Sequence, residues 1–302
     1  MKRIWILERA KYQGRLGNRL GLFAHFVACC LNNNDSLINF GFAEYADEFK
    51  NINSGLISFF PRKDISVSWN GITYYSCQTA IKILKQFPFS TSIEAELRRG
   101  EVLTQERHFD LNSPELQNYI AKYRLIFCRG WRFRCFNLIN DHAQNIRNFF
   151  APSEVIETAT KKWVNSIREE GKVIVGVHIR AGDYKRYWNG KYYYTPSKYA
   201  KIMKKIPKIF NNHKKVAFII FSDEKQSVHS FPELDVQISQ GSPVYDLSAM
   251  SFCDYLMGPP STFSNWASFY GQVPMWYIPS AEAEPSLDKF RVYLPLEIDA
   301  LG

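Results

Sequence analysis

The sequence predicts an α/β fold with mostly parallel β-sheets, and three observations lead to that prediction. Short runs of β-branched and aromatic residues alternate with stretches of helical apolar spacing along much of the chain. The run VIVGVHIRAGDY at 173–184 is typical of a buried strand that delivers polar residues at its carboxyl end. With 302 residues, 46% of them hydrophobic, the chain can form two domains of ordinary size.

The first half opens with a strand, a turn and a helix. Residues 4–7 predict a short buried strand, and the loop at 12–18 that follows contains two glycines. Apolar residues then recur at helical spacing from 20 to 31, and a second strand is expected at 37–40. This order predicts a Rossmann-like domain.

The middle of the chain is less regular. Residues 45–115 mix Phe, Pro and charge without a clear period, so we expect only short helices and loops there. A strand is predicted at 125–128, and a loop at 129–134 follows it. Pro152 precedes a new amphipathic helix, which places the domain boundary between residues 150 and 151.

The second half alternates strands and helices more clearly. We expect strands at 173–179, 216–221, 252–257 and 275–278. Thr195 and Pro196 begin a helix, because Pro is favoured at the first helical position, and residues 264–270 can form another. This alternation predicts a second, mostly parallel sheet.

Polar residues follow three of these strands, at ends that a parallel sheet brings to one edge. They are His178, Arg180 and Asp183, then Ser222 and Asp223, then Ser261, Thr262 and Ser264, with Asp246 before a predicted helical turn at 247–253. A planar guanidinium and a helix N-terminus both suit phosphate, and a carboxylate can accept the N–H groups of guanine. We therefore expect a nucleoside diphosphate site, and because no Asp-x-Asp occurs, we expect no metal.

The formal charge of +9 is unevenly distributed. One basic patch comprises Lys198, Lys201, Lys204, Lys205, Lys208, Lys214 and Lys215, and a second comprises Arg124, Arg129, Arg132 and Arg134. Such patches attract phosphates, nucleic acid or anionic lipid, or simply form a solvated helix face. No nucleic-acid recognition module accompanies them.

Cysteine usage and hydropathy point to one compartment. The six cysteines form no C-x-x-C pair and have no zinc-like spacing, so we expect free thiols. No signal peptide or 18-residue apolar run is present. We expect a cytoplasmic protein, with peripheral contact at the inner face of the membrane through its basic patches as one option.

Four segments together resemble a known family. They are GRLGNRLGLFAHF at 14–26, VHIRAGDY at 177–184, FSDE at 221–224 and DLSAMSFCDYLMGPPSTFSNWASF at 246–269. They are similar to fucosyltransferases that share the H-x-R-x-G motif, above all to the bacterial α-1,2-fucosyltransferases, with kinship to the α-1,6 and protein O-fucosyltransferases.

This resemblance implies a GT-B fold, in which two Rossmann-like domains with mostly parallel sheets face a cleft. Residues 1–150 would form the acceptor-side domain and 151–302 the GDP-sugar-binding domain. The implied reaction is inverting and metal-independent, and uses no cofactor. It transfers fucose from GDP-fucose to a hydroxyl of a glycan acceptor such as a galactoside.

The resemblance also implies roles for individual residues. Arg180 would bind the β-phosphate and stabilise it as the leaving group. The other donor-binding residues would be His178 and Asp246 at the guanine, Asp223 under the nucleotide, Ser261, Thr262, Phe263 and Ser264 along the diphosphate and ribose, and Gly14, Gly17 and Asn18 in a first-domain loop. The sequence departs from the family pattern at Ala181, Pro260 and Asn265, where Arg, Asn and Trp are usual.

Two assignments stay open. Asp183 is either the base that deprotonates the acceptor or a carboxylate that orients Arg180. The aromatic rings at 184–194, among them Tyr187, Trp188 and Tyr192, either stack on acceptor sugars or pack as a lid.

Three other functions are compatible with the sequence. The enzyme could use another GDP-sugar or make another linkage, the basic patches could bind nucleic acid, or the chain could bind sugar without catalysis.

Overall fold

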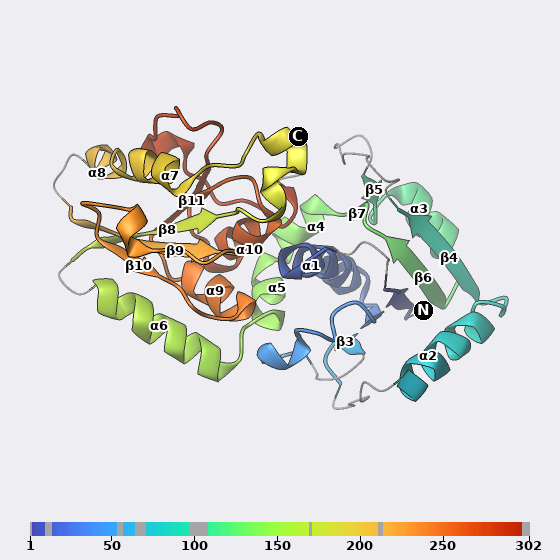
Figure 1. Cartoon of the computed structure of the whole chain (residues 1–302). Coiled ribbons are helices and arrows are strands. Elements are labelled where there is room, and N and C mark those ends of the chain that lie inside the picture. Colours follow the sequence, from blue (N-terminus) through green and yellow to red (C-terminus); the bar gives the residue numbers. More distant parts are fainter. Residues whose placement is uncertain are drawn as a thin grey trace. The chain divides into compact units, whose positions relative to one another are not determined.

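The computed structural model describes residues 2–9, 14–52, 57–63, 71–96, 108–168, 171–210 and 214–297. The chain divides into two compact units, Met1–Ser153 and Glu154–Ile298 (Figure 1). This division falls close to the boundary expected between residues 150 and 151. Each unit is built around its own β-sheet.

The first unit contains a five-stranded sheet in the order β3-β2-β1-β6-β4. Its strands are β1 (Ile4–Leu7), β2 (Ser36–Asn39), β3 (Ser58–Phe60), β4 (Ser90–Ala95) and β6 (Leu125–Gly130). All neighbours are parallel except β3, which runs antiparallel to β2. A small parallel pair, β5 (Phe109–Asp110) and β7 (Phe133–Arg134), forms a separate sheet.

Helices cover both faces of this sheet because its side chains alternate between the faces. On one face, Trp5 contacts Phe26 of α1 with ring centroids 6.0 Å apart. On the other, Ile6 packs in a buried cluster with Ile81 of α2. The helical elements are α1 (Leu16–Asn33), η1 (Ala46–Glu48), α2 (Gly71–Leu84), α3 (Pro114–Ile120), α4 (Phe136–Asp141) and α5 (Ala143–Phe149).

The second unit contains a fully parallel five-stranded sheet in the order β10-β9-β8-β11-β12. Its strands are β8 (Val173–Ile179), β9 (Val216–Ser222), β10 (Val236–Ile238), β11 (Tyr255–Gly258) and β12 (Met275–Tyr277). All seven residues of β8 are buried, as a central parallel strand requires.

Helices lie on both sides of the second sheet, and Figure 1 shows α7 and α8 on one side and α6 and α9 on the other. Val175, Val177 and Ile179 of β8 share a buried cluster with Tyr199 and Ile202 of α7. The elements are α6 (Glu154–Arg168), η3 (Asp183–Lys185), η4 (Tyr187–Gly190), α7 (Pro196–Met203), α8 (Ile206–Ile209), η5 (Val228–Ser230), α9 (Pro243–Met250), α10 (Thr262–Gly271) and η6 (Leu287–Lys289).

The predicted elements agree with these bounds in part. The strands at 4–7 and 173–179 are confirmed, and α7 begins at Pro196 as expected. Residues 45–115, where we expected only short helices and loops, contain the 14-residue helix α2 and the six-residue strand β4. Three further expectations were wrong in detail. The strand predicted at 252–257 starts only at Tyr255, Asp246 lies inside α9 instead of before a helical turn, and the predicted loop at 129–134 contains the end of β6 and all of β7. Part of the Gly-rich loop at 12–18 lies outside the described residues.

The six cysteines are free, as predicted. In the part of the chain that the structure describes, no helix has both the length and the apolar character needed to cross a bilayer.

Candidate functional site

The three polar strand ends meet at one edge of the second sheet. Strand β8 lies between β9 and β11, and all three are parallel, so their carboxyl ends are neighbours. The structure therefore brings together the side chains that follow these strands, as the sequence predicted. This edge is where open α/β sheets bind ligands.

The guanidinium of Arg180 lies between two carboxylates. Its Nη2 is 2.8 Å from Oδ1 of Asp183, and its Nη1 is 3.0 Å from Oδ2 of Asp223. The other oxygen of Asp223 accepts a hydrogen bond of 2.9 Å from the amide of Ala181. The ring of Tyr184 lies 5.7 Å from the guanidinium carbon. Arg180 has only 14% of its side chain exposed, so these contacts hold the guanidinium in one orientation.

His178 is buried beside α10. Its Nδ1 is 3.2 Å from Oγ of Ser264, and its ring centroid is 5.4 Å from that of Phe263. Burial, helped by the positive charge of Arg180, lowers the pKa of His178 to about 3. The imidazole is therefore neutral near pH 7, and it can exchange hydrogen bonds but cannot act there as a cation.

The end of β11 packs directly on β8 at Gly258. A Cβ at this position would lie 2.7 Å from the carbonyl oxygen of His178, so any larger residue would push the two strands apart. The glycine thus keeps His178 close to the loop that leads into α10.

The N-terminus of α10 is formed by small polar residues. Ser261 is the N-cap and accepts a hydrogen bond of 3.3 Å from the amide of Phe263. The hydroxyl of Ser264 lies 3.3 Å from the carbonyl oxygen of Ser261. Thr262 and Phe263 are half-buried in the first turn. Such a helix terminus offers amide hydrogens and a positive dipole end to an anion.

Tyr184 connects this terminus to Arg180. Its hydroxyl donates a hydrogen bond to the carbonyl oxygen of Pro260, while its ring lies against the guanidinium. We did not single out Tyr184 from the sequence, since nothing in a loop with many tyrosines distinguishes it.

Asn265, which departs from the family pattern, has a structural position. Its amide nitrogen donates to the carbonyl oxygen of Leu294 at 2.9 Å, and its amide oxygen accepts from the amide of Leu296 at 2.8 Å. It therefore fixes the segment that follows η6 instead of pointing to a ligand.

Asp246 lies in the first turn of α9 and is mostly buried. The hydroxyl of Ser239 donates a hydrogen bond to its Oδ1. Burial raises the pKa of Asp246 to about 7, although this hydrogen bond opposes the shift. Ser239 was missed by sequence reasoning, because it lies in an unpatterned turn seven positions before Asp246.

The aromatic segment after Arg180 divides between surface and core. Tyr187 stacks on Trp188 at 4.8 Å and is 49% exposed. Tyr192 is only 6% exposed and belongs to the cluster around β8 and α7. The expectation that Tyr192 contacts an acceptor was therefore wrong, since its ring is already covered by the protein.

The Gly-rich loop of the first unit is tightly built. Gly14 has a φ of +66°, and a Cβ there would lie 1.9 Å from the side chain of Asn18. Arg19 donates from Nε to the carbonyl oxygen of Gly14 at 3.1 Å. Gly17 is buried in the first turn of α1. These contacts give Asn18 a defined position within the first unit.

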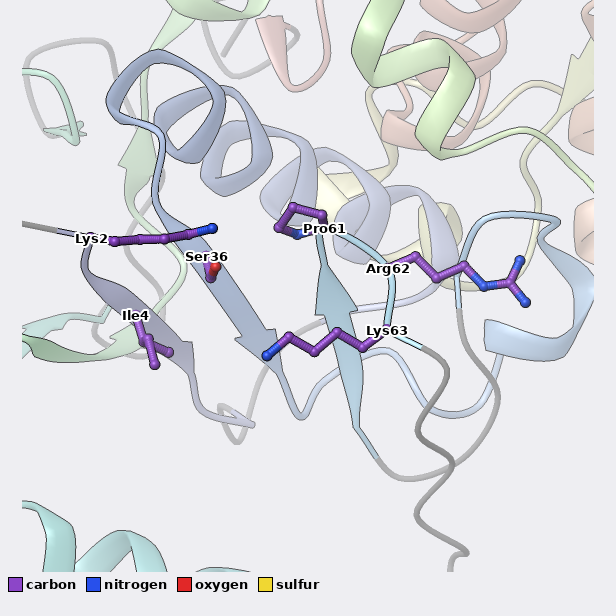
Figure 2. Close-up of a pocket in the computed structure, with 6 residues that line it drawn as sticks. All are labelled: Lys2, Ile4, Ser36, Pro61, Arg62 and Lys63. Atoms are coloured by element: carbon purple, nitrogen blue, oxygen red, sulfur yellow. The ribbon is translucent and has the colours of Figure 1, made fainter.

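Each unit also has a cavity. A cavity of about 340 Å³ in the first unit is lined by Lys2, Ile4, Ser36, Pro61, Arg62 and Lys63. Figure 2 shows Arg62 extending away from Ser36. Ile4 and Ser36 begin β1 and β2, so this cavity lies at the sheet edge opposite the Gly14 loop. It has no part in the site described here.

The second unit has a cavity of about 420 Å³ at the carboxyl ends of β8 and β9. Ile179 and Ala181 line it from the β8 side, and residues 224–227 line it from the β9 side. Among the described residues, no group of three or more His, Cys, Asp or Glu side chains is arranged to hold a metal ion.

The basic patches are less available than their sequence suggests. Arg134 is 2% exposed and donates to the carbonyl oxygens of Trp131 and Phe133, so including it in a surface patch was wrong. Lys204 pairs with Glu233 and Lys205 with Glu284, each at 2.6 Å. These contacts weaken the case for nucleic-acid binding.

A model of glycosyl transferase family 11 matches residues 90–280, which is more than half of the chain. No curated protein matches the sequence.

Solved structures share the fold at low identity. POFUT1 in complex with GDP-fucose is 14% identical with a TM-score of 0.52, covering 94% of this chain and 96% of that one. The apo form of POFUT1 is 12% identical, also with a TM-score of 0.52, covering 92% and 98%. Fucosyltransferase NodZ from Bradyrhizobium is 15% identical with a TM-score of 0.49, covering 92% and 95%.

Proposed function

The chain belongs to glycosyl transferase family 11, and from this premise we propose that it transfers fucose from GDP-fucose to a hydroxyl of a glycan acceptor. The observation that carries the proposal is the Arg180 guanidinium, fixed by Asp183 and Asp223 at the carboxyl edge of a parallel sheet. The fold likeness to POFUT1, which has been solved with GDP-fucose, supports the choice of donor.

The donor would bind along this edge. Arg180 has five N–H donors, of which two are used in the ion pairs with Asp183 and Asp223, so it can also bind the β-phosphate. The amides and hydroxyls of the first turn of α10, from Ser261 to Ser264, would complete the diphosphate site. Asp246 in its ionised form would accept the guanine N–H groups. His178, neutral and buried, would contact the base, and Gly14, Gly17 and Asn18 would contribute from the first unit.

The reaction we propose is a displacement at the anomeric carbon. The acceptor oxygen forms a bond to C1 of fucose while the bond between C1 and the β-phosphate oxygen breaks, so GDP leaves with the electron pair. Negative charge builds on the departing phosphate, where Arg180 stabilises it most strongly. The acceptor proton passes to a base or to water, and the anomeric configuration is inverted.

Asp183 has two open roles, and its ion pair with Arg180 supports the positioning role. In this role the Asp183→Asn substitution lowers kcat without changing the shape of its pH profile. A general base would instead contribute roughly 10²–10⁴-fold, and its loss would remove the acid limb of the profile. The pH dependence of kcat in this variant therefore separates the two roles.

We further propose a GT-B arrangement, catalysis without a metal, and an α-1,2 linkage to a galactoside. The sequence segments that resemble the α-1,2-fucosyltransferases support the linkage. The lack of an Asp-x-Asp pair in the sequence, together with the Arg180 and α10 donors, supports catalysis without a metal.

The test is an acceptor screen with GDP-fucose, read by mass and linkage analysis, alongside calorimetric titration with GDP and UDP. We expect GDP to bind more tightly than UDP and one class of glycan to gain a deoxyhexose. Transfer from another GDP-sugar but not from GDP-fucose would overturn the donor assignment, and no transfer from any donor would overturn the proposed activity.

A further inference from the structure

The cavity at the carboxyl ends of β8 and β9 has a lining that no step of the reaction uses. It measures about 420 Å³, within the roughly 300–1,000 Å³ typical of small-molecule sites. Its lining residues are Ile179, Ala181, Tyr193, Tyr194, Pro196, Glu224, Lys225, Gln226, Ser227 and Ser230. It adjoins the Arg180 cluster, because Ala181 and Glu224 directly follow Arg180 and Asp223 in the chain.

The charge of the lining argues for a neutral ligand. Among the described residues that line the cavity, the charged ones are Glu224 and Lys225, which have opposite charges. Glu224 is also paired with Lys185 at 3.0 Å. A phosphate or a nucleic acid would need several converging cations, whereas here the carboxylate of Glu224 accompanies Lys185 and Lys225. The cavity thus differs from the Arg180 cluster in the kind of ligand that it can hold.

The cavity combines a flat apolar surface with directed polar groups. Tyr193 is half-buried, so one part of its ring remains open, and Ile179 and Pro196 add apolar surface. Both amide hydrogens of Gln226 point into the protein, to Oγ of Ser222 at 3.1 Å and the carbonyl oxygen of Glu224 at 3.2 Å. Its carbonyl oxygen is therefore the atom that it offers to a ligand.

Serine hydroxyls complete this polar set. Oγ of Ser227 accepts a hydrogen bond of 3.3 Å from the amide of His229, which leaves its own hydrogen to donate. Ser230 lines the same wall. Sugars present apolar C–H faces and hydroxyls that both donate and accept, and rings with nearby polar groups match both features.

Tyr193 packs against the buried cluster around β8 and α7, to which Tyr194 belongs. Tyr194 is 3% exposed, and its hydroxyl donates to the carbonyl oxygen of Ile278 at 3.1 Å. The Lys185 ammonium lies 5.9 Å from the centroid of the Tyr193 ring. A ring held in this way loses little entropy when a ligand stacks on it.

We infer that this cavity is a saccharide subsite, which holds a sugar unit of the acceptor away from the hydroxyl that reacts. The inference rests on the proposed function. In this subsite, Tyr193, Gln226 and Ser230 would recognise the acceptor. The cavity that they line is on the side of β8 opposite His178. Binding energy from such a remote unit helps to orient the reacting hydroxyl.

The experiment compares variants with an oligosaccharide acceptor found in the screen. Tyr193→Ala removes the ring and Ser230→Trp fills the cavity, and each should raise the acceptor KM by roughly tenfold, which corresponds to about 1.4 kcal/mol. The GDP dissociation constant should stay unchanged in both. Tyr193→Phe keeps the ring and should restore a KM near that of the wild type.

Tyr75→Ala is the matched control, because Tyr75 is a 73% exposed tyrosine in the first unit. Thermal unfolding of each variant shows whether it is folded. If Tyr193→Ala does not fold, Ser230→Trp still tests the subsite. If the wild type transfers fucose and the folded variants keep its acceptor KM, the subsite assignment is overturned while the proposed function stands. If the wild type transfers nothing, the proposed function itself fails, and the subsite with it.

Discussion

The guanidinium of Arg180 is held by two carboxylates before any substrate arrives. Asp223 has 12% of its side chain exposed and Asp183 has 56%, so the two ion pairs differ in solvent access. The Asp223 pair is the less exposed of the two, so it keeps the guanidinium in place. In the proposed reaction, this arrangement would prepare the cation for the charge that develops on the leaving group.

Replacing Arg180 by Ala should lower the rate of fucose transfer by about 10²–10³-fold, because loss of one such donor costs about 3–4 kcal/mol in the transition state. Steady-state kinetics with GDP-fucose measures this. Arg168→Ala is the matched control. Arg168 is also ion-paired, to Asp254 at 3.1 Å, but Asp254 precedes β11 and lies at the opposite edge of the sheet. Equal losses in the two variants would mean that Arg180 acts only through stability.

GDP binding should strengthen as the pH rises through the pKa of Asp246, which burial raises to about 7. Below this pH the carboxyl is protonated and loses acceptor capacity, and above it the carboxylate can accept guanine N–H groups. Calorimetry from about pH 6 to about pH 8 should show the affinity for GDP rising by up to roughly tenfold per pH unit. Asp246→Asn is the control, because the phosphate of GDP titrates equally in the variant and the wild type. If GDP affinity rises as steeply with pH in the variant as in the wild type, Asp246 does not bind the guanine.

Some residues of the site could be predicted from the type of their side chain and their position after a buried strand. Arg180, Asp223 and Ser261 carry functional groups that stand out after a buried strand. Tyr192 and Arg134 were misjudged for a different reason. The sequence does not say which ring of an aromatic run faces the core, nor that carbonyl oxygens of a nearby turn will solvate a buried guanidinium.

Among the elements, those of the second unit were predicted best because its strands are β-branched runs with clear polar ends. Residues 45–115 were not, although they contain η1, β3, α2, β4 and β5. Strand β3 has only three residues and β5 only two, too few for a period to be visible. Helix α2 has 14 residues with a mixed surface, so its apolar stripe is weak in the sequence.

The N-cap of α10 allows a prediction at this scale. Ser261→Ala removes the hydrogen bond to the amide of Phe263 and should lower the free energy of unfolding by about 1 kcal/mol. It should also weaken GDP binding, because the first turn would be less well ordered.

Ser113→Ala is the control for this prediction. Ser113 caps α3 in the first unit by accepting from the amide of Leu116 at 3.2 Å. Chemical denaturation should show a similar loss of stability, while GDP binding remains that of the wild type. If both variants lose GDP affinity equally, the α10 terminus has no special part in donor binding.

At the scale of the whole molecule, two α/β units carry a net charge of +9. In the proposed reaction, the Arg180 guanidinium and the amides of the α10 N-terminus would neutralise the diphosphate, as a divalent ion does in other glycosyltransferases. The sequence predicted this division into two α/β halves from the alternation of elements.

Chelation tests this feature of the whole enzyme. With Arg180 and the α10 amides neutralising the diphosphate, fucose transfer should keep its rate after dialysis against EDTA, as measured with and without added magnesium. A loss of more than about tenfold that magnesium restores would show that a metal takes part in catalysis, and would refute the proposal of catalysis without a metal.

The most direct measurement is a crystal structure of the protein with GDP. We expect the β-phosphate to lie within hydrogen-bond distance of Arg180 and the first turn of α10, with the guanine at Asp246. A diphosphate bound elsewhere in the second unit, or one that leaves Arg180 tied only to its two carboxylates, would contradict this expectation.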